Sequence, residues 1–472
     1  MRLPIPALIL LPLLGACTVG PDYQRPAVAG VAAGWATPAA STAPPDAEPW
    51  RELGDPVLVE LVERAGAANL DLKQAEARLR EARAGLDAAN GGRLPQVGVA
   101  TSASQQQLSK NGQLPLGSLP GFDRRFSLFD AGFDASWEPD LWGGTRRAVE
   151  AAGRRVEAAE AQRQDVRLRV VAETGRAYAE LRGAQAEAAI LRSDADAQRR
   201  LATLLRQSFA AGEVSRGDDA EAEARARTAE AALPGAQARI RAAIHALALL
   251  TAQPPEALLE PLLAPAPIPL PPAQIAAGLR SDVLRRRPDV IAAEAQLAAA
   301  TADVGVETAN LFPRVSLLGG VGQQARGLGD IASGGSTRFQ IGPSLNWPIF
   351  AGGRIRAQIR AADARADAAA AAYEQAVLGA LADSETALNR YNAALAAAAE
   401  LSAARDRGAA ALDLARQRQR AGEDSLPDLL QAQLRFNAID RAAAIARRQA
   451  LEAHAALVKA LGGGWTGTAE RR

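Results

Sequence analysis

Two stretches of about 65 residues, 145–209 and 354–420, have a helical pattern and contain no proline. At a rise of 1.5 Å per residue, a helix of this length would reach roughly 100 Å, far beyond any helix of a globular domain. The composition suits such helices, because alanine dominates and only 4% of the residues are aromatic. Small side chains let long helices approach each other closely. We therefore expect elongated, paired helices in place of ordinary globular domains.

Each long stretch ends at a glycine-containing turn and is followed by a returning helix. The turns are Ala211-Gly212-Glu213 and Ala421-Gly422-Glu423, and the returning helices are predicted over 218–251 and 426–461. Pro234 lies inside the first returning helix and should kink or divide it, because proline cannot donate the backbone hydrogen bond that a helix interior requires.

Shorter helices are predicted earlier in each half of the chain, over 56–90 and 288–310. Asp55 can cap the first of them, with Pro56 in its first turn. Between the two halves, residues 261–287 begin with a dense run of prolines and are predicted to be a linker.

Four short segments alternate between apolar and polar side chains, with a period of two residues. They are residues 97–104, 129–137, 315–322 and 338–347. In the second segment Phe129, Phe133 and Trp137 lie on one face, and Asp130 and Asp134 lie on the other. A strand that crosses an outer membrane as part of a barrel has about this length and this alternation. The apolar face is expected to meet lipid, and the aromatic residues to form a girdle at the membrane surface.

The order of these elements occurs twice. Pro139 and Gly143 match Pro348 and Gly352 at a shift of 209 residues, and the two glycine-containing turns match at a shift of 210. A duplication explains this agreement. The predicted organisation is a first repeat, a linker, a second repeat and a tail. Their ranges are 56–260, 261–287, 288–465 and 466–472.

Four strands cannot close a barrel on their own. The smallest closed membrane barrels have about eight strands, and an open edge in lipid leaves unpaired backbone groups that cost several kcal/mol each. The strands must therefore be shared among copies of the chain. The predicted fold class is an α+β membrane protein, a trimer whose twelve-stranded barrel continues into a long helical barrel in the periplasm.

The first residues have the pattern of a bacterial lipoprotein signal. A short apolar run in residues 1–16 is too short to span a membrane and ends at Leu14-Gly15-Ala16-Cys17, which resembles a lipobox. Cys17 is the only cysteine, and we predict that it carries the lipid; the alternative is ordinary signal cleavage beside an incidental free thiol. Residues 17–55 are predicted to form a tether. Thr18, in place of an aspartate, favours sorting to the outer membrane over retention at the inner one.

The chain resembles the TolC-type outer-membrane factors, and among them the NodT-type lipoproteins of efflux systems. The matching strings are Cys17 to Pro26 after the lipobox, Leu284 to Val290 in mid-chain, and two strings near the end, from Ala421 to Gln433 and from Ala460 to Trp465. The resemblance implies a homotrimer in the outer membrane, lipid-anchored and extending into the periplasm. It implies a passive exit duct for drugs or other small toxic compounds, opened by a periplasmic adaptor and an inner-membrane pump of the RND type.

The resemblance also places a gate at the periplasmic helix tips. Leu412, Asp413, Arg416 and Arg420 recur at helical spacing just before the second turn, and three copies would form rings of charge with an apolar constriction. Pairs between Asp413 and Arg416, for instance between neighbouring subunits, would hold the tube closed; the alternative is a solvated surface pair worth at most about 1 kcal/mol. The adaptor is expected to dock on the two turns. Their residues are Ala211, Gly212, Glu213, Ala421, Gly422 and Glu423.

Signals of other functions are weak. His245 and His454 are the only histidines, and we interpret them as packing residues because no metal-ligand spacing accompanies them. The run from Arg285 to Arg287 is interpreted as the start of a helix with buried arginine–carboxylate pairs, since the net charge of +1 gives no basic field for nucleic acid. We therefore expect no enzyme, no metal, no cofactor and no nucleic-acid partner.

Two other functions remain open on the sequence. A channel for secreted polypeptides would share the fold, because a passive lumen does not record its substrate. A lipid-anchored periplasmic scaffold of coiled-coil type, without a pore, would account for the long helices but not for the four alternating segments.

Overall fold

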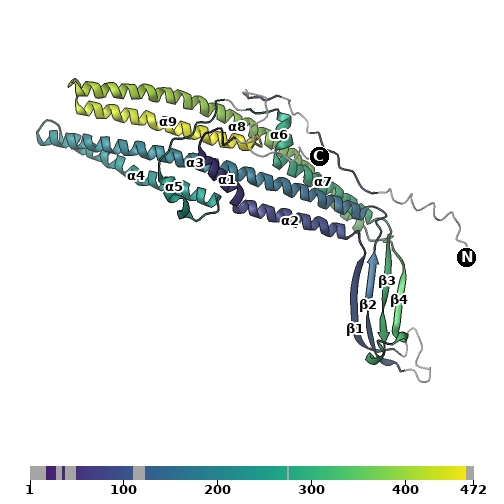
Figure 1. The fold of residues 1–472 in the computed structure, drawn as a ribbon. Coiled ribbons are helices and arrows are strands. Elements are labelled where there is room, and N and C mark those ends of the chain that lie inside the picture. Colours follow the sequence, from purple (N-terminus) through teal and green to yellow (C-terminus); the bar gives the residue numbers. More distant parts are fainter. Residues whose placement is uncertain (1–17, 28–33, 38–48, 110–122, 274–275, 464–472) are drawn as a thin grey trace. The chain divides into compact units, whose positions relative to one another are not determined.

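The structure, a computed structural model, describes residues 18–27, 34–37, 49–109, 123–273 and 276–463. Cys17, the predicted signal segment and the predicted tail lie outside this range. The chain forms two compact units, one built around the strands and one around the helical hairpins (Figure 1). Among the described helices, none combines the length and the hydropathy that a membrane crossing needs.

The four predicted strands are present and form one antiparallel sheet in the order β1-β2-β3-β4. Their bounds are β1 Gln96–Gln107, β2 Arg125–Trp137, β3 Arg314–Ala325 and β4 Thr337–Asn346. The register pairs Phe133 with Val99 on one side and with Val321 on the other, and Val321 pairs in turn with Phe339. Because paired residues share a face, the apolar sets of all four strands lie together, as the alternation predicts.

The long helices form two hairpins of equal dimensions, consistent with the predicted duplication. Helices α3 (Gly144–Ala210) and α8 (Arg354–Arg420) each have 67 residues, and the returning helices α4 (Arg216–Leu250) and α9 (Leu426–Ala460) each have 35. Figure 1 shows α3 beside α4 and α8 beside α9. Pro234 does not divide α4, contrary to one of the two predicted outcomes. It is exposed, so water can bond the carbonyl that its missing N–H leaves free.

The first short helix is two helices, where the sequence pattern predicts one. Helix α1 (Pro56–Ala68) ends at Asn69 and α2 (Leu70–Gly91) follows. The Asn69 side chain accepts hydrogen bonds from the backbone N–H groups of Asp71 and Leu72, and its amide donates to the carbonyl of Leu250. These bonds satisfy the free N–H groups at the start of α2, so the helical periodicity continues across a break that it does not reveal. Asp55 caps α1 as predicted.

The range predicted as a linker contains short helices. A 3-10 turn, η4 (Pro255–Leu258), leads into α5 (Leu259–Leu263), and α6 (Arg280–Arg286) directly precedes α7 (Pro288–Ala309). Leu258 and Leu262 are buried against α4, which explains why a proline-dense segment is ordered here. Two further 3-10 turns, η5 (Leu328–Asp330) and η6 (Gly334–Ser336), connect β3 to β4.

The core of the helical unit is thin and rich in alanine. Tyr178 and Leu247 are fully buried in it, and Trp50 lies against α3 at Gly175. A Cβ atom on Gly175 would lie 2.3 Å from the Trp50 ring, so only glycine fits there. Such close contacts are how helices with small side chains exclude water without a thick core.

Candidate functional site

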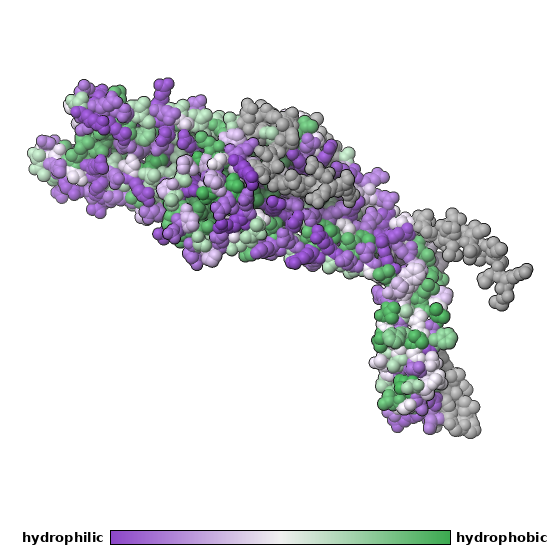
Figure 2. Space-filling view, in the orientation of Figure 1, coloured by the Kyte–Doolittle hydropathy of each residue, from purple (hydrophilic) through white to green (hydrophobic). Residues whose placement is uncertain are grey.

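The two faces of the sheet differ sharply in chemistry. Phe339 is 79% exposed and Ile341 is 84% exposed on the apolar face. The strand region in Figure 2 carries many green, hydrophobic residues at its surface, whereas purple residues dominate the helices. Leaving such side chains in water is unfavourable, and an apolar face of this kind is suited to contact with lipid.

A charged network lies on the opposite, polar face. Arg338 on β4 reaches across β3 to Asp130 on β2, with its Nε and Nη2 atoms 2.8 and 2.6 Å from the carboxylate oxygens. Gln324 donates to the same carboxylate at 2.8 Å. Gly322 lies on β3, which runs between β2 and β4, and a Cβ atom there would lie 2.6 Å from the β2 backbone. The network ties the two repeats together on the face that the alternation assigns to the lumen.

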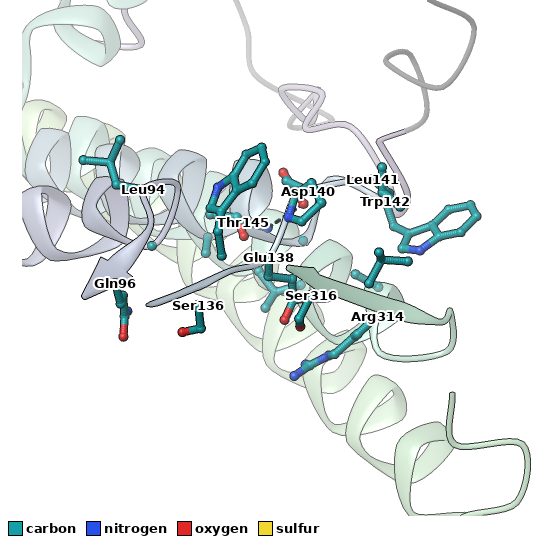
Figure 3. Close-up of a pocket in the computed structure, with 18 of the residues that line it drawn as sticks. Leu94, Gln96, Ser136, Glu138, Asp140, Leu141, Trp142, Thr145, Arg314 and Ser316 are labelled. Carbon is teal, nitrogen blue, oxygen red and sulfur yellow. Dashed lines mark hydrogen bonds between the residues drawn. The ribbon is translucent and has the colours of Figure 1, made fainter. Parts of the chain in front are cut away.

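A cavity of about 570 Å³ lies where β2 leads into α3 and α7 leads into β3 (Figure 3). Ser136, Ser316 and Arg314 contribute polar atoms to its lining. Asp140 also lines it, but its carboxylate accepts hydrogen bonds from the backbone N–H groups of Thr145 and Arg146 at the start of α3. Asp140 is therefore a helix cap.

The two predicted docking turns have the same geometry in both repeats. Gly212 and Gly422 have φ angles of +82° and +78°, and the backbone N–H groups of Glu213 and Glu423 bond carbonyls five residues earlier. This arrangement ends a helix and favours glycine, which has no Cβ to strain. All six predicted docking residues are exposed.

The returning helices begin with a capping box that the sequence analysis did not single out; the predicted start at 426 agrees with α9, whereas α4 begins at Arg216, two residues before its predicted start. Ser215 accepts a bond from the Asp218 N–H, and the Asp218 carboxylate accepts one from the Ser215 N–H. Ser425 and Asp428 repeat this capping box. Hydrogen bonds from the serine lower the pKa of both aspartates, because they stabilise the carboxylate form.

Three of the four predicted gate residues are exposed: Asp413, Arg416 and Arg420. The expected pair between Asp413 and Arg416 is not formed within the described protomer. Asp413 instead accepts a bond from Gln417 at 2.8 Å, and Arg416 donates to Gln433 on α9 at 3.1 Å. Both contacts are single hydrogen bonds at an exposed surface, so a new partner can replace them at small cost.

Leu412 does not fit the predicted apolar constriction. It is 3% exposed and therefore packs inside the protomer. One turn earlier, α8 approaches α9 so closely that a Cβ atom on Gly408 would lie 3.2 Å from the Ile439 side chain. Leu412 follows Gly408 by four residues, which places it on the same buried face of the helix. We remove Leu412 from the proposed gate for this reason.

The predicted arginine–carboxylate pairing at the mid-chain signature is confirmed. Arg287 is 8% exposed and binds Asp289 through two hydrogen bonds of 3.0 and 2.5 Å. It also donates to Asp383 and to the carbonyls of Ala380 and Ala460. Burial disfavours the charge, but these carboxylates outweigh it and raise the pKa of Arg287. One side chain thus connects the start of α7 with α8 and the end of α9.

The first described residues are fastened by side chains that the sequence analysis did not single out. Arg147 at the start of α3 donates to the carbonyl of Val19 at 3.2 Å and binds Asp22 at 2.6 Å. Arg25 and Tyr23 both donate to the Glu294 carboxylate. No sequence spacing relates these residues, because the contacts join segments more than 120 positions apart.

The two histidines differ in environment. His454 is 1% exposed and packs edge-on against Trp50, with ring centroids 5.8 Å apart. Its burial lowers its pKa to about 4, because the imidazolium loses hydration. This confirms the packing interpretation for His454, whereas His245 is exposed on α4. In the described part of the chain, no three His, Cys, Asp or Glu side chains are placed to hold a metal ion.

Long helical hairpins joined to a sheet with one apolar and one polar face define the subunit of an outer-membrane channel. The chain belongs to the outer membrane efflux protein family, whose model matches residues 61–253 and 279–463. This confirms the predicted resemblance, the fold class and the outer-membrane location.

Similar proteins cover nearly the whole chain. OpmQ, the pyoverdine export outer membrane protein of Pseudomonas putida, is 33% identical over 477 residues, 97% of each chain. TtgI, the toluene efflux pump outer membrane protein of Pseudomonas putida, is 30% identical over 478 residues, 98% of each chain. The solved structure of the outer-membrane channel OprN is 36% identical and matches with a TM-score of 0.82, covering 95% of this chain and 100% of that one.

Proposed function

We propose that three copies of this chain close their sheets into a twelve-stranded barrel and act as the passive exit duct of a tripartite efflux system. The observation that carries the proposal is the separation of faces across all four strands, with Phe133, Val321 and Ile341 on one side and Asp130 and Arg338 on the other. An apolar outer surface and a polar inner surface are what a water-filled barrel in lipid requires.

The two edges of the sheet support an oligomer. Strands β1 and β4 each have one neighbour in the protomer, so the outer side of each carries unpaired backbone groups. These groups cannot be left open to hydrocarbon, and pairing β4 with β1 of another copy satisfies them.

We propose that the cargo consists of small molecules that the cell must expel. The relatives named for pyoverdine export and for toluene efflux differ widely in the polarity of their cargo, as expected if selection is made upstream of a passive lumen. An RND-type pump would select the substrate and a periplasmic adaptor would couple it to the duct. The chain itself would catalyse no reaction, and we find no observation that favours polypeptide secretion over this proposal.

The exposed turns at the ends of α3 and α8 are the proposed docking points of the adaptor. Asp413 and Arg416 lie nine and six residues before Gly422, and their weak contacts within the protomer leave them able to pair between subunits. Adaptor binding would break such pairs and shift the channel from closed to open.

Single-channel conductance in a planar bilayer tests the duct and its gate together. Wild-type protein without adaptor should conduct weakly, and Asp413→Ala combined with Arg416→Ala should conduct more. Arg365→Ala, on the same helix far from the turn, is the matched control and should behave as wild type. If the double variant keeps its oligomeric state and its conductance is unchanged, these two residues are not the gate. Absence of any conductance in all three proteins would contradict the duct.

A further inference from the structure

Two tryptophans relate the strands of one repeat to those of the other. The indole N–H of Trp137, at the end of β2, donates to the carbonyl of Arg93 just before β1, at 2.9 Å. The indole N–H of Trp347, just after β4, donates to the carbonyl of Leu311 just before β3, at 3.1 Å. The equivalent positions therefore differ by 210 residues from β2 to β4 and by 218 residues from β1 to β3.

The observed hairpins test the sum of these two shifts. Gln96 on β1 pairs with Ser136 on β2. The shifts of 218 and 210 carry this pair onto Arg314 and Asn346, which are partners in the β3–β4 hairpin. The two hairpins therefore have the same register, and the duplication holds for backbone pairing as well as for the order of elements.

The junction between the repeats, β2 with β3, is also visible in the protomer, and it pairs Asp134 with Gly320. Adding 210 to Asp134 gives Ser344 on β4, and subtracting 218 from Gly320 gives Ser102 on β1. Strands β4 and β1 are the two edge strands of the sheet. We propose that β4 pairs with β1 of a second copy of this chain in this transferred register, with Ser344 opposite Ser102 of the partner subunit. The inference rests on the proposed oligomer and specifies its interface.

The transferred register keeps the two faces of the barrel intact. Within the protomer, Gln96 pairs with Ser136, Ser136 with Leu318, and Leu318 with Gly342. In the transferred register Gly342 then pairs with Ser104 of the partner subunit. The advance is eight residues, an even number, so apolar side chains stay on the outer face around the ring. A register shifted by one residue would place the apolar side chains of β4, such as Ile341, on the same face as the polar side chains of β1 in the next protomer. The hydrophobic pattern excludes this arrangement.

The exposure of equivalent residues indicates where the partner packs. Leu141 follows β2 and is half-buried, and next to it Trp142 stacks on Phe312 with ring centroids 4.8 Å apart. Past the strands, the shift of 209 that relates Pro139 to Pro348 makes Phe350 equivalent to Leu141, and Phe350 is 91% exposed. The shift of 218 makes Leu94 equivalent to Phe312, and Leu94 is 65% exposed. Positions that are half-buried inside the protomer at the first junction are exposed at the second. Phe350 and Leu94 therefore mark the surfaces that the partner subunits cover in the proposed assembly.

Disulfide cross-linking reads the register directly, because directly opposed strand residues can be bridged and residues displaced by two cannot. The test variant combines Ser102→Cys with Ser344→Cys. Two matched variants combine Ser102→Cys with Gly342→Cys or with Asn346→Cys, which report registers shifted by two residues. The unchanged chain, with Cys17 alone, is the blank, and Ser136→Cys with Leu318→Cys is the positive control within one chain.

The readouts are native mass in detergent and the ladder of covalent species on a non-reducing gel after mild oxidation. We expect a trimer mass for every variant and covalent dimers and trimers from the Ser102–Ser344 combination alone. A trimer that cross-links through Gly342 or Asn346 instead would overturn the register and leave the oligomer standing. A monomer mass for the unchanged chain would overturn the proposed oligomer, and the register with it.

Discussion

At the scale of single residues, Arg287 has the largest structural role that the contacts support. Its guanidinium donates to two carboxylates and to two backbone carbonyls, and it is nearly shielded from water. Arg285, two positions earlier, is exposed. Two arginines of one short run therefore have opposite environments, because α6 ends between them and the chain turns inward.

Replacement of Arg287 by alanine should destabilise the protein by about 2 kcal/mol, because it leaves two buried backbone carbonyls without their donor and removes the packing of a buried side chain. The measurement is the midpoint of thermal unfolding in detergent, followed by circular dichroism. Arg285→Ala is the control and should lie close to wild type. Equal midpoints for the two variants would show that Arg287 does not anchor α7.

His454 predicts a specific pH dependence of stability. The unfolded chain has an ordinary histidine pKa near 6.5, whereas burial lowers the pKa of His454 to about 4 in the fold. Between these values the unfolded state binds the additional proton, so stability is full above about pH 6.5 and falls as the pH drops to about 4. His454→Phe should lose less stability over this interval than wild type in urea titrations at several pH values. Parallel curves for the two proteins would exclude this linkage.

At the scale of elements, the helix tips are held by local bonds and have few packing contacts. A Cβ atom on Gly422 would meet no atom within 4 Å, so its φ angle of +78° is the only reason for glycine there. Gly379, inside α8, also has open space around its Cβ position but has a helical φ. Neither position has a steric collision, and the two glycines differ only in backbone φ. Alanine substitutions at Gly422 and Gly379 therefore isolate the effect of backbone strain.

Gly422→Ala should destabilise the tip by about 1 kcal/mol, since alanine disfavours a positive φ, and Gly379→Ala should stabilise α8 by roughly 0.5–1 kcal/mol. Amide hydrogen exchange of α8 and α9 measures both effects. Protection near residue 420 should fall in the first variant only. Unchanged protection there would mean that the turn can adopt another geometry without cost.

The sheet predicts a difference between its faces. Ile341→Arg places a charge on the apolar face and should cost roughly 2–4 kcal/mol if the residue lies near the membrane midplane. Ser344→Arg, three positions along the same strand, places the charge on the polar face and should be tolerated. Asp134→Arg is a poorer control, because Asp134 lies near Arg338. Folding yield into lipid vesicles measures the difference, and equal losses would reverse the assignment of faces.

At the scale of the whole molecule, the described residues that follow Cys17 are held against the fold, close to the proposed site of the lipid. Thr18 contacts Gly143, and Val19 donates to the carbonyl of Trp142, so the residue after Cys17 is held beside the strand unit. A second site in the helical unit holds the same segment farther along. There Glu385 accepts hydrogen bonds from the backbone N–H groups of Ala36 and Thr37.

We predict that Cys17 is the mature N-terminus and carries the lipid. Mass spectrometry of the N-terminal peptide should show acylation at Cys17, and cleavage elsewhere or an unmodified thiol would refute it. Cys17→Ser should lose the lipid and still assemble, because Arg147 and Glu294 hold the segment independently of the acyl chains.

Local chemistry in the sequence determined the elements. The three- and four-residue spacing predicted the long helices to within a few residues, and the period of two predicted all four strands and both of their faces, because side-chain direction follows from backbone geometry alone. The glycine-containing turns followed from the need for a positive φ. The break at Asn69 escaped this reasoning, since a side chain that caps a new helix leaves the hydrophobic period unchanged.

Only the tertiary structure decided which distant residues meet. The pair of Asp130 with Arg338 depends on the register of three strands, and the burial of Leu412 depends on how α8 packs against α9. These contacts join positions whose separation along the chain carries no information on distance, so no spacing rule predicts them. The register between β2 and β3 is of the same kind, and only once it was visible could the duplication in the sequence specify how one copy of the chain meets the next.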